Sequence, residues 1–248
     1  MAALISPSVI GHRGACGHAP ENTLASMKKA AELGSQWVEF DVRLSRDGVL
    51  VVFHDAGLQR TTNGKGLVAE TDLADLQALD AGGWFSKEFA GEAIPTLSQV
   101  AGELARLGLG ANVEIKQGAE TARAAARFLA NLWPDNSPPP LISSFHEDAL
   151  AAAAETAPQI SRALCINKIP PDWRQRLDGL GCAALHCKHD RLKPEQAAAA
   201  AAAGVALRCY TVNRASRALK LFGWGVNAVF SDFPERISKR MGGSGLEC

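Results

Sequence analysis

The chain has 248 residues, of which 47% are hydrophobic and 21% are charged, and its formal net charge is zero. This composition is that of a folded globular protein and excludes a largely disordered chain. Without net positive charge no general attraction to nucleic acid is expected, so local charges must hold any anionic ligand. The length suits a single α/β barrel, which uses about 250 residues.

No segment of the sequence predicts export or membrane insertion. The first residues, MAALISPSVIGHRG, contain no basic segment followed by a long apolar run, so no export signal is expected. The longest tract of low polarity, residues 197–207, contains a glycine and is too short to span a bilayer. We therefore predict a cytoplasmic protein with no stable membrane insertion and no nucleic-acid partner.

The six cysteines form no C-x-x-C pair, and several of them lie within apolar, strand-like runs. Buried, reduced thiols are therefore expected. The alternative is a zinc site formed by Cys182, His186, Cys187 and His189, although their spacing fits no familiar zinc pattern.

Predicted strands and helices alternate along most of the chain. Short apolar runs indicate strands at residues 7–11, 36–44, 110–116, 141–145, 160–165, 182–187, 205–211 and 228–231. Helical segments are indicated at residues 22–33, 97–107, 119–132, 147–155, 172–177, 194–203, 214–222 and from Pro234 onward. Strands that each precede a helix favour a parallel sheet with right-handed crossovers. We therefore predict an α/β fold, a TIM (β/α)8 barrel.

One interval breaks this alternation. Glu39 and Glu114 lie on consecutive predicted barrel strands, yet the chain between them is more than twice the roughly 31 residues that one unit of an eight-fold barrel uses. We interpret residues 46–95 as a small insertion after strand 2, which forms a lid and pocket wall over the barrel mouth within a single domain spanning 1–248. It holds an apolar run at 48–53, a turn-rich loop at 60–66, a short helix at 72–79 and an aromatic loop around Trp84.

Acidic side chains on two consecutive strands share the face that points into the barrel. Because side chains alternate along a strand, Glu39 and Asp41 lie on the face opposite Val38, Phe40 and Val42. On the next strand Glu114 likewise lies on the face opposite Val113 and Ile115. On a half-exposed strand such charges are simply solvated, but the inner face of a barrel is normally apolar. Three converging carboxylates need a cation, and oxygen ligands select a hard ion. We therefore predict a Mg²⁺ or Ca²⁺ site rather than a zinc site.

Two histidines lie at the ends of apolar runs near this predicted metal site. His12 follows the first strand, and His54 follows the run at 48–53. A lone histidine is more often structural, but a pair in these positions is suited to acid–base catalysis near neutral pH. Arg13 is placed to hold phosphoryl oxygens in a bidentate manner, and Lys116 is placed to supply a point charge.

Three further residues at strand ends point toward the same predicted site. Phe145, His186 and Tyr210 are placed to line a substrate pocket, with packing in the core as the alternative for each of them. We select Tyr210 as a substrate-binding candidate.

A series of motifs runs in order through nearly the whole chain: HRGACGHAPENT, WVEFDVRLSRDGVLVVFHD, LQRTTNGKG, IPTLSQV, NVEIK, YTVN and SDFPE. These motifs resemble those of the glycerophosphodiester phosphodiesterase family, and the first three are long and specific. The resemblance implies a metal-dependent TIM barrel with a small insertion after the second strand. It also implies hydrolysis of glycerophosphodiesters to sn-glycerol 3-phosphate and an alcohol.

The resemblance assigns roles to the same residues that the strand-end argument selects. By motif, His12 and His54 match the family's acid–base pair. The residues that match its metal ligands are Glu39, Asp41 and Glu114, and those that match its phosphate contacts are Arg13 and Lys116.

Two positions depart from the family's pattern. Tyr210 stands where tryptophan is usual, and His18 stands where an aromatic residue is common. Both departures concern the pocket wall, so they bear on the preference for the alcohol or the glycerol rather than on the reaction.

The resemblance leads to a mechanistic hypothesis. A cation held by the three carboxylates would bind a phosphoryl oxygen and a glycerol hydroxyl and would lower the pKa of that hydroxyl. One histidine removes its proton and the other protonates the departing alcohol; the route runs through a cyclic glycerol phosphate or through direct attack by water. The alternatives are a related barrel phosphodiesterase that acts on lysophospholipids or phosphoinositides, and a catalytically inactive barrel that only binds phosphodiesters. The neutral charge argues against the first, and the complete set of histidines and carboxylates argues against the second.

Overall fold

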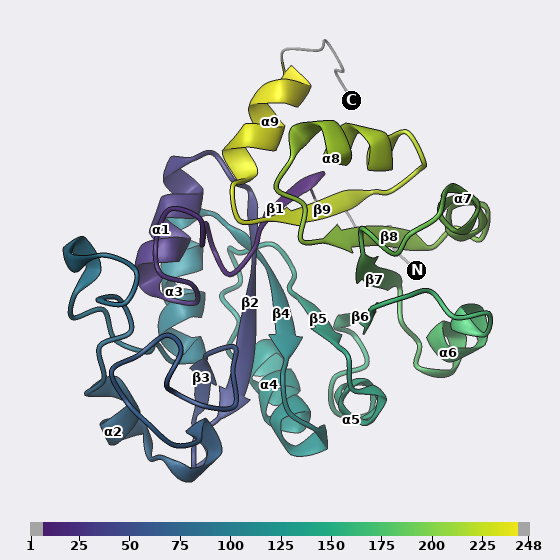
Figure 1. The fold of residues 1–248 in the computed structure, drawn as a ribbon. Helices are drawn as coiled ribbons and strands as arrows, with labels where there is room; N and C mark the ends of the chain where they lie inside the picture. The colour runs from purple at the N-terminus through teal and green to yellow at the C-terminus, as the bar shows by residue number, and fades with distance from the viewer. Residues whose placement is uncertain (1–6, 243–248) are drawn as a thin grey trace.

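The structure, a computed structural model, describes residues 7–242 and is built around a closed barrel (Figure 1). Of the nine strands in the described residues, eight run parallel and close through the pairing of β1 with β2, while β3 is antiparallel to β2. The barrel strands are β1 (Val9–Gly11), β2 (Trp37–Leu44), β4 (Gly110–Ile115), β5 (Leu141–Ser144), β6 (Ser161–Ile166), β7 (Ala184–Lys188), β8 (Ala206–Tyr210) and β9 (Ala228–Ser231). The predicted TIM barrel is therefore confirmed.

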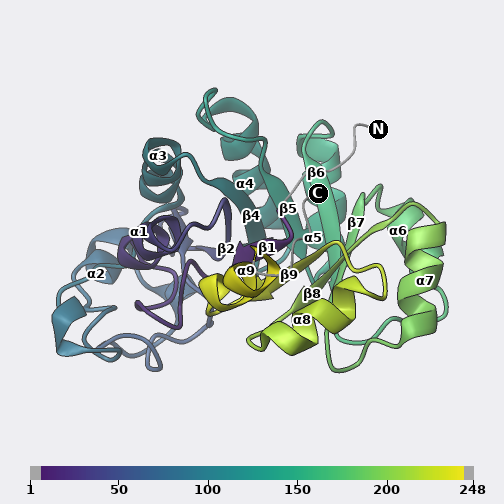
Figure 2. The ribbon, with the colours of Figure 1, turned by 90° about the horizontal axis from the view of Figure 1, so that it is seen from above.

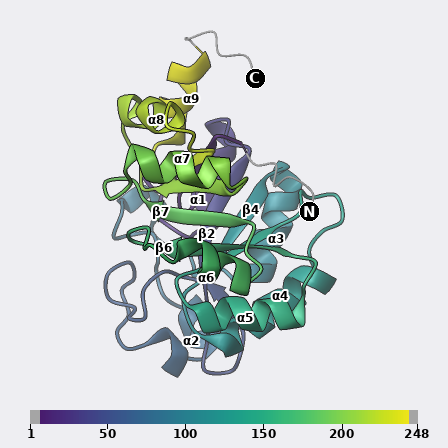
Figure 3. The same cartoon turned by 90° about the vertical axis from the view of Figure 1, so that its right-hand side faces the viewer.

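Helices cover the outside of the barrel, as two further views show (Figure 2, Figure 3). They are α1 (Leu24–Glu32), α3 (Leu97–Leu107), α4 (Ala119–Asn131), α5 (Glu147–Thr156), α6 (Trp173–Gly179), α7 (Pro194–Ala202), α8 (Ala215–Phe222) and α9 (Pro234–Gly242). Helix α3 has the predicted bounds because local signals define both of its ends. Thr96 and Gln99 form a capping box at its start, and Gly108 adopts the left-handed conformation after its end.

The two faces of strand β2 show how the barrel separates its core from its chemistry. Val38, Phe40 and Val42 are buried in the same apolar cluster as residues of α3, so this face packs against the helices. Trp37 on the other face joins a second apolar cluster, in the barrel interior. Glu39 and Asp41 follow Trp37 on that inner face and lie nearer the carboxyl end of the strand, where TIM barrels keep their active sites.

The segment between β2 and α3 interrupts the alternation of strands and helices. It contains β3 (Leu50–Val52), a 3₁₀ turn η1 (Val68–Glu70), the helix α2 (Leu73–Gln77) and a second 3₁₀ turn η2 (Lys87–Phe89). Figure 1 shows it to the side of β2, with α2 at its outer edge. The segment buries an apolar cluster of its own, formed by Val51, Phe53, Leu58, Val68, Leu76, Ala81 and Ile94.

The zinc site considered for Cys182, His186, Cys187 and His189 does not form. Cys182 and Cys187 lie in the apolar layer between barrel and helices, whereas His186 points into the barrel pocket. Five of the six cysteines lie in the described residues, and all five are free thiols; Cys248 lies outside them. Within residues 7–242, no helix has the length and hydropathy of a membrane span.

Candidate active site

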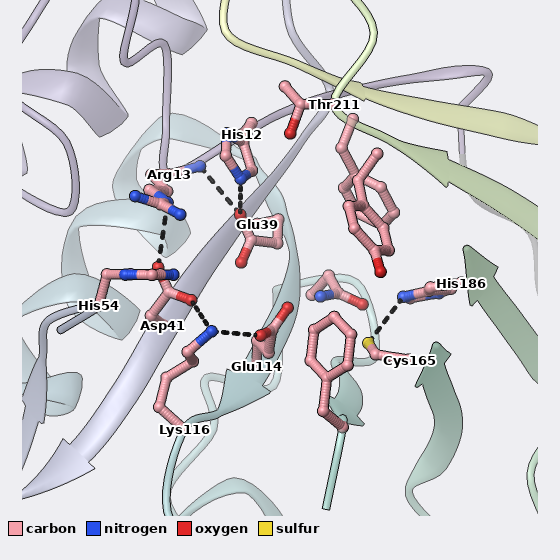
Figure 4. Close-up of a pocket in the computed structure, with 14 residues that line it drawn as sticks. His12, Arg13, Glu39, Asp41, His54, Glu114, Lys116, Cys165, His186 and Thr211 are labelled. Carbon is pink, nitrogen blue, oxygen red and sulfur yellow. Dashed lines mark hydrogen bonds and ion pairs between the residues drawn. The ribbon is translucent and has the colours of Figure 1, made fainter. Parts of the chain in front are cut away.

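A pocket of about 270 Å³ opens at the carboxyl ends of the barrel strands (Figure 4). It is lined by His12, Arg13, Glu39, Asp41, His54, Asn112, Glu114, Lys116, Phe145, Cys165, His186, Tyr210, Thr211 and Phe230. All the residues that the sequence selected as catalytic, substrate-binding or metal-ligating candidates are among them. Their placement in one pocket follows from strand ends that meet at one rim of the barrel.

Three carboxylates meet on one side of the pocket. Strands β2 and β4 pair in parallel with Asp41 opposite Glu114, and Glu39 precedes them on the same inward face. One oxygen from each of the three carboxylates lies within 4.8 Å of the other two. Burial raises the pKa of Glu39 well above its usual range, and the neighbouring Asp41 and Glu114 raise it further.

The three carboxylates differ in their surroundings. Burial alone would raise the pKa of Asp41, but nearby Arg13 and Lys116 outweigh it and lower that pKa; the Asn22 amide also donates a 2.8 Å hydrogen bond to this carboxylate. The pKa of Glu114 is raised by burial and by Asp41, although Lys116 donates a 2.8 Å hydrogen bond to it. Two buried carboxylates with raised pKa values, beside a third whose pKa is lowered, form a donor set that fits a hard divalent cation.

The His12 side chain is held by residues that follow barrel strands. Its Nδ1 lies 2.7 Å from Asp232 Oδ1, just beyond the end of β9, and its Nε2 lies 3.9 Å from Glu39 Oε2. Asn213, which follows β8, donates a 2.6 Å hydrogen bond to the other oxygen of Asp232. Burial would raise the pKa of Asp232, but the hydrogen bonds from His12, Cys16 and Asn213 keep it well below its usual range. With Nδ1 donating to Asp232, Nε2 is left facing the pocket.

The His54 side chain is held by residues of the segment between β2 and α3. Its Nδ1 lies 2.5 Å from Asp55 Oδ1, and its backbone carbonyl accepts a 2.9 Å hydrogen bond from Arg43. Arg60 in turn donates a 2.5 Å hydrogen bond to Asp55. Burial lowers the pKa of His54, and the positive charges of Arg13 and Lys116 lower it further against the opposing effect of Asp41. These effects favour the neutral form of the His54 imidazole.

Arg13 joins the two histidine regions. Its backbone N–H donates to Glu39 at 3.0 Å, and its guanidinium lies 3.3 Å from Asp41 and 2.7 Å from Glu21. Glu21 also pairs with Arg60 at 2.7 Å, so it bridges two arginines. The chain enters this arrangement through a left-handed backbone conformation at Arg13, with φ of +51°, which points the amide and the side chain toward the carboxylates.

Lys116 and two aromatic rings form the opposite wall. The ammonium of Lys116 lies 2.8 Å from Glu114, 3.6 Å from Asp41 and 5.7 Å from the centre of the Phe145 ring. Phe145 packs edge to face on Tyr210 at 5.8 Å. The Tyr210 hydroxyl donates to the Ile166 carbonyl at 2.7 Å, so Tyr210 offers its ring rather than its hydroxyl to the pocket.

Known proteins resemble this chain over nearly its whole length. Residues 12–236 match the model of the glycerophosphoryl diester phosphodiesterase family. The chain belongs to this family. A glycerophosphodiester phosphodiesterase of Caldanaerobacter subterraneus subsp. tengcongensis is 34% identical over 92% of the chain and 95% of its own length. One from Bacillus subtilis is 31% identical over 95% of the chain and 88% of its own length.

A solved structure of a family member resembles the whole barrel. It is an Oleispira antarctica phosphodiesterase in complex with the product sn-glycerol-3-phosphate. The two chains are 43% identical, with a TM-score of 0.93 over 95% of this chain and 97% of the other. A glycerophosphodiester phosphodiesterase from Agrobacterium tumefaciens is 27% identical, with a TM-score of 0.78 over 94% of this chain and all of the other.

Several residues of this chain that hold the pocket residues in place were not selected from the sequence. They are Glu21, Asn22, Asp55, Arg60, Asn213 and Asp232. Asp55 directly follows His54, and Asn213 and Asp232 lie in the YTVN and SDFPE motifs, so the motifs did contain a signal. What the motifs did not contain was the pairing, because Asp232 is 220 positions from His12.

Proposed function

We propose that this protein hydrolyses glycerophosphodiesters to sn-glycerol 3-phosphate and an alcohol, with a divalent cation and the pair His12 and His54. The observation that carries the proposal is the group of three carboxylate oxygens within 4.8 Å of one another, with an imidazole on either side. The similarity to a phosphodiesterase that was solved with sn-glycerol-3-phosphate supports this choice of substrate class.

Glu39, Asp41 and Glu114 are the residues that would hold the cation. Their all-oxygen donor set favours Mg²⁺ or Ca²⁺ over softer metals. The raised pKa of Glu39 and of Glu114 fits this role, because each of them is raised in part by a neighbouring carboxylate. Bound there, a divalent cation would neutralise the carboxylates and polarise a phosphoryl oxygen.

The two cationic side chains of the pocket bind the phosphoryl group in this proposal. Arg13 presents a planar guanidinium beside Asp41, and Lys116 presents an ammonium between Asp41 and Glu114. Arginine can hold two phosphoryl oxygens at once, whereas lysine acts as a point charge. The Phe145 and Tyr210 rings line the pocket beside Lys116, where they contact the substrate.

The histidines divide the proton transfers. His54, whose pKa is lowered by burial and by nearby cations, is the neutral base that takes the proton of the attacking hydroxyl or water. His12 has a carboxylate beside each of its ring nitrogens, at 2.7 Å and 3.9 Å, and it protonates the departing alcohol. Asp232 and Asp55 hold the Nδ1 atoms, so each Nε2 is the reacting atom.

Residues 46–95 contribute one of these two groups. They form a small insertion within a single barrel domain, and they wall the pocket by presenting His54 just after β3. The ion pairs of Arg60 with Asp55 and Glu21 connect this insertion to the loop that follows β1.

The test is an assay of glycerol 3-phosphate release from a panel of glycerophosphodiesters, with lysophosphatidylcholine included. EDTA should abolish release, and Mg²⁺ or Ca²⁺ should restore it.

His12→Ala and His54→Ala should each lower kcat by ~10²- to 10⁴-fold. His146→Ala is the matched control, because His146 is exposed and does not line the pocket. Activity within tenfold of wild type in either pocket variant would exclude that histidine from the proposed proton transfers. Preferential cleavage of lysophosphatidylcholine would show that lysophospholipids, rather than glycerophosphodiesters, are the substrate class.

A further inference from the structure

A second group of possible metal ligands lies on the far side of the His12 ring from the carboxylates. It consists of His12, Cys16 and Asp232, whose Nδ1, Sγ and Oδ1 atoms all lie within 4.8 Å of one another. Cys16 Sγ is 2.9 Å from Asp232 Oδ1 and 3.8 Å from His12 Nδ1. The reaction proposed above uses Asp232 to orient His12 and gives the thiol no role.

The spacing of these atoms is close to that of a zinc site. Ligands at tetrahedral angles, with Zn–N near 2.0 Å and Zn–S near 2.3 Å, lie about 3.5 Å from each other. The Sγ to Nδ1 distance of 3.8 Å already fits. The Asp232 oxygen lies closer to both partners, at 2.7 Å and 2.9 Å, and has to move outward by only about half an ångström to admit an ion.

The donor chemistry separates this group from the carboxylates beside it. One nitrogen, one sulfur and one oxygen suit a borderline-soft ion such as Zn²⁺ or Cd²⁺, whereas three carboxylates suit Mg²⁺ or Ca²⁺. Solvent reaches the site, because 18% of the His12 side chain and 25% of the Asp232 side chain are exposed. Cys16 is itself only partly buried.

We propose that His12, Cys16 and Asp232 form an inhibitory binding site for Zn²⁺ and related thiophilic ions. The ion binds His12 Nδ1, Cys16 Sγ and Asp232 Oδ1; the thiol proton is released to solvent, and the proton of the His12 ring moves from Nδ1 to Nε2 by exchange with solvent. His12 then loses the hydrogen bond that orients it, and its ring can no longer exchange a proton at Nε2 as a free imidazole does. The site blocks the enzyme without touching the carboxylates that hold the catalytic cation.

The binding itself is tested without reference to activity. Cd²⁺ is titrated into the purified protein in the presence of excess Mg²⁺, and the ultraviolet charge-transfer band of a cadmium–thiolate bond is recorded. Wild type should develop the band up to one equivalent of Cd²⁺. Cys16→Ser should lose it, and Cys182→Ser, which removes another thiol at the edge of the core, should keep it.

Glu114→Gln shows whether the ion occupies the proposed place. This variant removes a carboxylate from the neighbouring site but leaves all three proposed ligands intact, so the band should persist. Absence of the band in wild type, or its full retention in Cys16→Ser, overturns the proposal. Loss of the band in Glu114→Gln also overturns it, because binding of the ion would then require Glu114, which is not one of the three proposed ligands.

The inhibitory consequence rests on the proposed function and is measured separately. Zn²⁺ is titrated into the Mg²⁺-dependent assay, and each variant is normalised to its own zinc-free rate. Cys16→Ser should need ~10-fold more Zn²⁺ or more for half inhibition. Removing a residue that only contacts a metal ligand already lowers metal affinity by about tenfold, and Cys16 is a ligand itself in this proposal. Equal zinc sensitivity contradicts the inhibitory role. If no phosphodiester is hydrolysed at all, the proposed function fails while the cadmium titration still decides the metal site.

Discussion

The two histidines of the pocket are supported by different parts of the molecule. His12 rests on Asp232, which accepts a hydrogen bond from the neutral amide of Asn213, and both of these residues follow barrel strands. His54 rests on Asp55, which Arg60 holds through an ion pair, and 44% of the Arg60 side chain is exposed. The barrel therefore supports one histidine through an aspartate whose outer partner is a neutral amide, and the insertion supports the other through an aspartate whose outer partner is an exposed arginine.

This difference predicts unequal dependence on the two aspartates. Asp232→Asn should lower kcat by ~10²- to 10⁴-fold, because an amide no longer fixes the His12 tautomer or stabilises its protonated form. Asp55→Asn should cost only about tenfold, since the Arg43 hydrogen bond to the His54 carbonyl still holds the backbone of that residue. The measurement is kcat for one glycerophosphodiester at saturating cation. Equal losses, or a larger loss in Asp55→Asn, would remove the asymmetry between the two supports.

Arg60 is the link through which the insertion acts on the pocket. Arg60→Ala should lower kcat by about tenfold, because Asp55 and Glu21 both lose a partner and both His54 and Arg13 gain freedom. Arg46→Ala is the matched control: Arg46 is also an exposed arginine of the insertion, but it pairs with Asp72 and does not line the pocket. A comparable loss in Arg46→Ala would show that the effect comes from the insertion as a whole.

Ionic strength should affect the His54 side more than the His12 side. Raising salt from about 0.05 M to about 0.5 M screens the exposed pairs of Arg60 and should lower kcat about two- to threefold at saturating substrate. In Arg60→Ala the same change in salt should have little effect on kcat. A variant that stays as salt-sensitive as wild type would place the sensitive charges elsewhere.

The smallest expected effect is a shift in the pH profile. Because the pKa of His54 is held below its usual value of about 6.5, the neutral base persists to lower pH and kcat/KM falls only as this lowered pKa is reached. Lys116→Met removes one of the cations that lower this pKa. The acid-side midpoint of kcat/KM should therefore move to higher pH, by less than about one unit. Movement to lower pH would rule out His54 as the group that must be neutral.

The sequence predicted the barrel because its signals are local. Alternating side chains on β2, the capping box of α3 and the glycine after it each depend on residues close together in the chain. The bounds of the strands were less well defined. The strand predicted at 182–187, for example, begins at Ala184, because pairing with neighbouring strands decides where a ladder starts.

The candidate site was predictable to the extent that its residues lie at strand ends. Parallel strands bring their carboxyl ends to one rim, so His12, Glu39 and Glu114 had to lie near one another once the barrel closed. Their support was not predictable in the same way. The hydrogen bond from His12 to Asp232 and the bridge from Arg13 through Glu21 to Arg60 depend on side-chain positions across the barrel mouth.

By itself the sequence determined which residues are candidates for the chemistry, because residue type and alternation along a strand are properties of the chain. The tertiary structure decided how those residues are charged and oriented. Burial raises the pKa of Glu39, whereas Arg13 and Lys116 lower that of Asp41 two positions away. Two acidic residues of one strand thus differ because desolvation and Coulomb interactions depend on distances in space rather than on distances along the chain.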